Sequence, residues 1–76
     1  MQGLTIHGVN IGNQIRKARM KAALTQEQLA FKCGLSRNYI SLVELGQKSP
    51  TIATLARICK AMGVRASALI AAAETG

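Results

Sequence analysis

The stretch from Thr25 to Leu45 constrains the fold of this chain more than any other part of it. Thr25 is a favoured helix N-cap, and Gln28, three residues later, completes a capping box, so a helix is expected to begin here. Gly34 stands where a helix exits through a left-handed residue, and Ser36 can cap a second helix almost at once. The pattern predicts two short helices joined by a tight turn that contains glycine.

The second of these helices has an apolar face and a polar face. Ile40 and Val43 fall on one stripe, which must face inward. The opposite face begins with Arg37 and Asn38 in its first turn. Arg can donate two hydrogen bonds to guanine O6 and N7, and Asn pairs in the same way with adenine N6 and N7 in the major groove. Because the N-terminal residues of a recognition helix reach the bases, the pattern predicts a helix-turn-helix that reads DNA, over residues 25–45.

From residue 11 to residue 70 the chain resembles the Cro and phage-repressor type of helix-turn-helix proteins, also called the XRE family. The order and spacing hold over about four fifths of the chain. The matching residues are Gly12, Ile15, Arg16, Arg19, Leu24 to Ala30 (LTQEQLA), Gly34, Leu35, Ser36, Ile40, Glu44, Gly46, Lys48, Pro50, Leu55, Met62-Gly63-Val64 and Leu69. The resemblance implies an all-α fold, a compact five-helix lambda-repressor-like DNA-binding domain, and a transcriptional regulator. A repressor that occupies promoter DNA is expected, with activation through polymerase contact as the alternative.

Four residues on the outer face of the second helix are expected to read base edges: Arg37, Asn38, Ser41 and Leu42. Leu42 lies where many members of the family carry a polar base-reader, so we expect it to touch a thymine methyl instead of forming a hydrogen bond.

The DNA phosphates are expected to be held from both sides of this helix. Gln26 opens the first helix of the pair, near a helix N-terminus that favours anions. Tyr39 lies at the edge of the reading face. Gln47, Lys48 and Ser49 form a polar loop whose backbone amides and lysine can hold phosphate, as in the family. The contacts to phosphate would set the register, and the contacts to bases would choose the site.

The resemblance also implies a salt bridge between Arg19 and Glu44. An Arg at the first position pairs with a Glu at the end of the reading helix in the family, and Arg suits a bidentate carboxylate partner. Its expected role is to orient the reading helix, because partly buried ion pairs add little net stability.

The chain carries ten Lys and Arg against three Glu, a net charge of +7 for 76 residues. Such an excess favours a polyanionic partner, although a merely solvated basic surface is the alternative on charge alone. No apolar run is long enough to span a membrane, and the cations are too dispersed for a membrane-active helix. The start, MQGLTIHGVN, does not read as a signal peptide, so a cytoplasmic protein is expected.

Catalysis, metal binding and a cofactor are not expected. Cys33 and Cys59 fall on apolar helix faces without metal-ligand spacing, so they are predicted to be buried free thiols. The chain offers no nucleophile–base pair and no pair of carboxylates, which argues against an enzyme. No small-molecule ligand is evident either.

The sequence divides into residues 1–9, an N-terminal extension, residues 10–73, the helix-turn-helix domain, and residues 74–76, a tail. The extension is either disordered or an arm laid against the domain, in which case Leu4 or Ile6 could cover Phe31, which points outward. The first helix is predicted from Ile11 to Ala22 with Asn10 as its cap.

The remaining helices follow from caps and apolar spacing. Residues predicted to face the core are Ile11, Ile15, Ala18 and Ala22 in the first helix, and Ile52, Leu55, Ile58, Cys59 and Met62 in the fourth. Thr51 is predicted to cap the fourth helix and Gly63 to end it, with Arg57 and Lys60 pointing outward.

The last helix is predicted from Val64 to Ala73, with a weak N-terminal cap. In the family this helix often forms the two-fold contact, and its Ala-rich surface permits close approach, so a homodimer on a palindromic operator is expected. Two alternatives remain: an antitoxin-like interaction module of a toxin–antitoxin pair, and a controller protein of a restriction–modification system, which the segment RNYIS loosely resembles.

Overall fold

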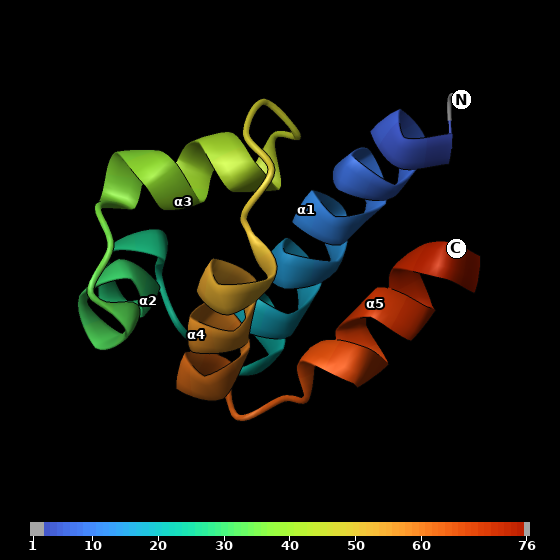
Figure 1. Ribbon diagram of the computed structural model, residues 1–76. Helices are drawn as coiled ribbons and strands as arrows, with labels where there is room; N and C mark the ends of the chain where they lie inside the picture. Colours follow the sequence, from blue (N-terminus) through green and yellow to red (C-terminus); the bar gives the residue numbers. More distant parts are fainter. Residues whose placement is uncertain (1–2, 76) are drawn as a thin grey trace.

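The computed structural model describes the backbone of residues 3–75 and the side chains of residues 11–74. The described part is all α-helical, as predicted. Its elements are α1 (Gly3–Lys21), α2 (Gln26–Cys33), α3 (Arg37–Glu44), α4 (Ile52–Met62) and α5 (Ala66–Thr75). In Figure 1, α2 and α3 lie on one side of α1, and α5 lies on its other side. Helix α4 lies between α2 and α5 and contacts both. None of the described helices is long and apolar enough to cross a membrane.

The first helix is longer than the sequence predicted. It begins at Gly3 rather than Ile11, so Asn10 lies inside the helix and the predicted cap there is wrong. Once α1 is anchored by its packing, each added residue gains a hydrogen bond, and no proline interrupts residues 3–10. Most of the predicted extension is therefore helical, while Met1 and Gln2 lie outside the described residues.

The expected cover of Phe31 involves Leu4 and Ile6, whose side chains lie outside the described residues. Phe31 itself keeps 87% of its surface exposed. An aromatic side chain therefore stands uncovered on the outer face of α2.

The caps around α2 and α3 are those predicted. Thr25 Oγ1 accepts a hydrogen bond from the Gln28 amide at 3.0 Å, and Gln28 Oε1 accepts one from the Thr25 amide at 2.9 Å. Gly34 ends α2 with a φ of 72°, a left-handed conformation that glycine adopts without steric cost. Ser36 Oγ then accepts from the Tyr39 amide at 3.0 Å and starts α3.

One aliphatic core joins all five helices. Its fully buried members include Ile15 from α1, Leu29 from α2, Ile40 and Val43 from α3, and Ile58 from α4. Two core predictions are wrong. Ile52 is 74% exposed, because it is the first residue of α4 and extends beyond the end of the core, and Ala22 is exposed just past the end of α1.

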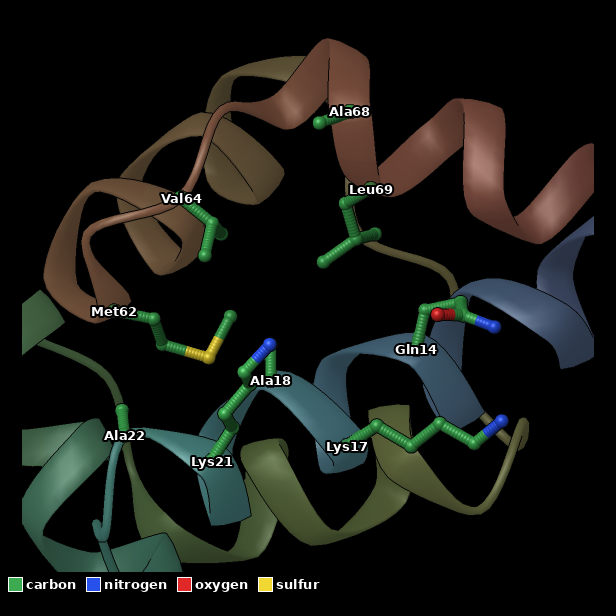
Figure 2. Close-up of a pocket in the computed structure, with 9 residues that line it drawn as sticks. All are labelled: Gln14, Lys17, Ala18, Lys21, Ala22, Met62, Val64, Ala68 and Leu69. Atoms are coloured by element: carbon green, nitrogen blue, oxygen red, sulfur yellow. The ribbon is translucent and has the colours of Figure 1, made fainter.

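The last helix starts and ends two residues later than predicted, so Glu74 and Thr75 belong to α5 rather than to a tail. Leu69 and Ala73 are its buried residues. An open groove of about 530 Å³ lies between α1, the end of α4 and α5, and Figure 2 shows Lys17 and Lys21 of α1 beside it.

The turn after α1 contains a strained residue. Ala23 has a φ of 61°, the one positive φ among the described non-glycine residues. An L-residue in this region costs about 1–2 kcal/mol, so Ala23→Gly is expected to raise the free energy of unfolding by about 1 kcal/mol in urea titrations. The adjacent Ala22→Gly, at a position without positive φ, is the control and should lower it. Stabilisation by both changes, or by neither, would contradict the strain.

Candidate nucleic-acid interface

The reading helix α3 separates its two faces as the sequence predicted. Ile40 and Val43 are buried, with at most 1% of their surfaces exposed. Arg37 and Asn38 are exposed in the first turn, and Ser41 and Leu42 are half-buried one turn later. Two side chains capable of bidentate base contacts therefore stand in solvent at the N-terminal end of α3.

The C-terminal end of α3 is held by a network around Glu44. Arg19 donates to both oxygens of this carboxylate, from Nε to Oε2 at 2.7 Å and from Nη2 to Oε1 at 3.1 Å. Arg19 Nη1 also donates to the carbonyl oxygen of Leu24 at 2.8 Å. The side chains of Arg19 and Glu44 are only 12% and 3% exposed. The predicted bridge is confirmed, and it ties α1 and the turn before α2 to the end of the reading helix.

Gln26 belongs to the same network, which the sequence did not predict. Its Nε2 donates to Glu44 Oε1 at 3.0 Å, so one amide N–H faces the protein. The carboxamide has a second N–H, and the backbone N–H of Gln26 is the first of α2, where no helical acceptor exists. A phosphate contact from Gln26 must therefore use one of these groups.

The loop after α3 bonds back onto the end of that helix. The backbone amides of Gln47 and Lys48 both donate to the carbonyl oxygen of Leu42, at 2.9 and 3.3 Å. The left-handed Gly46 folds these two amides back onto the end of α3, which leaves the side chains of the loop for the predicted phosphate contact. The side chains of Gln47 and Lys48 are exposed.

Residues 15–69 match the family described as "Helix-turn-helix". The chain belongs to this XRE-type helix-turn-helix family. It is 36% identical over 62 residues to the immunity repressor protein of Bacillus phage phi105, covering 82% of this chain and 43% of the repressor. It is 38% identical over 60 residues to control protein C.BamHI of Bacillus amyloliquefaciens, covering 78% of this chain and 74% of that protein.

The fold is likewise similar to a solved helix-turn-helix regulator. The restriction-modification controller protein C.AhdI from Aeromonas hydrophila superposes with a TM-score of 0.77 at 33% identity, over 80% of this chain and 92% of that one. Family and relatives together make the chain a DNA-binding transcriptional regulator of the helix-turn-helix type.

Two residues that support the helix-turn-helix were not recognised as such in the sequence. Gly12 of α1 lies against the backbone of α3, where an added Cβ would collide with the carbonyl oxygen of Val43 and meet that of Glu44 at 3.0 Å. The sequence marks Gly12 only as a position that matches the family. A glycine inside a helical pattern, with its known cost in helix propensity, was the available signal.

Arg57 is the other residue. It is exposed on α4, as predicted, and its Nη2 also donates to the carbonyl oxygens of Cys33 at 2.8 Å and Gly34 at 3.4 Å. Nothing in the local sequence indicates this contact, because donor and acceptors lie 24 and 23 residues apart.

Both cysteines are buried free thiols, as predicted. Burial raises the pKa of each thiol, and for Cys33 backbone hydrogen bonds and the charge of Arg57 offset part of this rise in pKa. No cluster of three or more potential metal ligands occurs among the described residues.

Proposed function

We propose that this regulator is a sequence-specific repressor that binds duplex DNA as a homodimer on a palindromic operator. The observation that carries the proposal is the first turn of α3, where Arg37 and Asn38 stand exposed while Ile40 and Val43 of the same helix are buried. A helix held from behind and polar in front fits the major groove.

Within this proposal Arg37 donates to base edges, Asn38 and Ser41 donate to or accept from them, and Leu42 offers an apolar contact to a thymine methyl. Lys48, Tyr39 and the side chain of Gln47 approach the sugar-phosphate backbone from the ends of α3. Gln26 adds the N–H groups at the start of α2, a position that favours anions.

The dimer is proposed to form through α5. Its exposed residues include Ser67, Ala68 and Ala71, which are small enough to let a second helix approach closely. A two-fold dimer of this kind predicts half-sites roughly 34 Å apart, one helical turn of DNA. Selection of duplexes from a random library, followed by sequencing, tests the operator, and sedimentation equilibrium tests the dimer. Recovery of no preferred sequence would refute the proposal.

A second candidate is the controller of a restriction–modification system, which the likeness to C.BamHI and C.AhdI favours. A third, an antitoxin-like module, draws on the exposed Phe31, which a partner protein could cover. Purification of the chain from its native host tests the third candidate, since a stoichiometric small partner on Phe31 would support it.

Arg37→Ala is expected to weaken binding to the selected duplex by about 1–3 kcal/mol and to relax discrimination at one base pair. The reason is the loss of a bidentate contact to a base edge. Fluorescence anisotropy with the selected duplex and its single-base variants measures both effects. Arg65→Ala, an exposed cation just before α5, is the control. An equal loss of affinity for all duplexes would contradict base reading by Arg37.

Lys48→Ala is expected to weaken binding to every duplex alike and to flatten the slope of log K against log salt by about one unit. One phosphate contact releases about one counterion, so titrations at several salt concentrations report it directly. Lys60→Ala on α4 removes the same charge elsewhere on the exposed surface. A slope that is unchanged in Lys48→Ala would argue against its contact with phosphate.

A further inference from the structure

The orientation of α3 depends on what holds each of its ends. Its middle is fixed by Ile40 and Val43 in the core, and its C-terminal end by the pairing of Glu44 with Arg19. Its N-terminal end carries Arg37 and Asn38, and it follows directly on the turn at residues 34–36. This turn includes the exposed, left-handed Gly34, a residue with more backbone freedom than any other.

The carbonyl groups at the end of α2 show how the turn is held. The carbonyl oxygens of Ala30 and Phe31 accept from the amides of Leu35 and Gly34, at 2.9 and 3.3 Å, so these two are satisfied within the turn. The carbonyl oxygens of Cys33 and Gly34 accept instead from the Arg57 guanidinium. The last carbonyl oxygens of a helix find no N–H donor within the helix and carry partial negative charge, so a cation is well placed there.

We propose that Arg57 is a positioning residue for DNA reading. Its guanidinium, held on α4, clamps the two carbonyl groups of the turn and so fixes the direction in which the first turn of α3 leaves α2. Together with the Arg19–Glu44 pair at the opposite end, this gives α3 a polar anchor at each end. The inference rests on the proposed function, because it concerns how Arg37 and Asn38 are presented to the bases.

Two other roles for Arg57 make different predictions. If Arg57 bound phosphate, its removal would flatten the salt dependence of DNA binding by about one unit. If Arg57 only raised the free energy of global unfolding, its removal would increase the exposure of all core residues to the same extent. The clamp predicts an unchanged salt slope and a local opening of the turn.

The chain provides a reporter for that opening and an internal reference. Cys33, whose carbonyl group receives the bond, and Cys59 on α4 are both buried thiols, with 7% and 1% of their surfaces exposed. Opening of the turn would expose Cys33 alone, whereas global unfolding would expose both. Modification of each thiol by methyl methanethiosulfonate, followed by mass spectrometry of peptides, gives the two rates separately.

The experiment compares Arg57→Met, which keeps the aliphatic chain without donors, with Arg57→Lys, which keeps a charged donor. Ile58→Val is the matched control, because it removes one buried carbon from the neighbouring core position and touches neither the turn nor the DNA face. Thiol modification and binding to a duplex selected by the wild-type chain are measured at a temperature at which circular dichroism shows all variants fully folded.

Arg57→Met is expected to speed modification of Cys33 about tenfold relative to Cys59 and to weaken binding to the selected duplex about tenfold, the effect of one hydrogen bond from a charged donor. Arg57→Lys should restore most of both. Ile58→Val should leave the Cys33 to Cys59 ratio and the affinity near the wild-type values.

Equal acceleration of both thiols in Arg57→Met, or a flattened salt slope, would overturn the clamp. The clamp would also be overturned if Arg57→Met exposes Cys33 but keeps the full affinity for DNA and the full discrimination between duplexes. If the wild-type chain selects no duplex, the proposed function fails, and the thiol ratio still decides whether Arg57 holds the turn.

Discussion

Gly12→Ala is expected to lower the free energy of unfolding by about 3 kcal/mol, although alanine is the better helix former. In an unobstructed helix the change would stabilise the chain by about 0.5–1 kcal/mol. Here the added Cβ would collide with the carbonyl oxygen of Val43, and backbone cannot rotate away as a side chain can. Relief requires α1 and α3 to separate, which also opens the core between them. Urea titration followed by circular dichroism measures the loss.

The sign of this effect is diagnostic. Asn13→Ala, at the neighbouring exposed position of α1, provides the matched control, because it raises helix propensity without a collision. It should leave the stability unchanged or slightly higher. Stabilisation by Gly12→Ala would mean that α1 and α3 lie farther apart in solution than in this structure.

Arg19→Met should lower the free energy of unfolding by about 3–5 kcal/mol. The change leaves the Glu44 carboxylate, whose side chain is 3% exposed, with Gln26 as its remaining side-chain donor among the described residues. A buried charge without its counterion is costly, whereas the intact pair contributes little net stability. Arg16→Met removes an exposed cation from the same helix and should change the stability by less than about 0.5 kcal/mol.

The double variant Arg19→Met with Glu44→Leu separates the two terms. Because the buried charge is gone, much of the lost stability should return. DNA discrimination should not return with it, since the bonds that fix the end of α3 are absent. The single variant Glu44→Leu completes the comparison. If the free energy of unfolding lost by the double variant equals the sum of the losses in Arg19→Met and Glu44→Leu, Arg19 does not stabilise the buried Glu44 carboxylate.

Much of the DNA-reading unit was predictable because its signals are local. The capping box of Thr25 and Gln28, the left-handed Gly34 and the cap at Ser36 each involve residues within a few positions of one another. The two faces of α3 follow from helical periodicity alone. The Arg19–Glu44 bridge spans 25 residues, and it was predictable only because the chain resembles a family in which this pair occurs.

The errors arose where distant segments decide the outcome. Helix α1, which packs against α3 and α5, extends to Gly3, past the apparent cap at Asn10. Ile52 has the right periodicity for the core but lies past the end of it.

By itself, then, the sequence determined the five helices, the N-terminal caps of α2, α3 and α4 and the polar face of α3, because turns, caps and amphipathic periodicity are set by neighbours along the chain. Only the tertiary structure decided that Gly12 admits the backbone of α3, that Gln26 joins the carboxylate of Glu44, and that Arg57 reaches the turn before α3. These contacts join helices that are far apart in the sequence, and no local pattern specifies which donor will lie beside which acceptor after the core has packed.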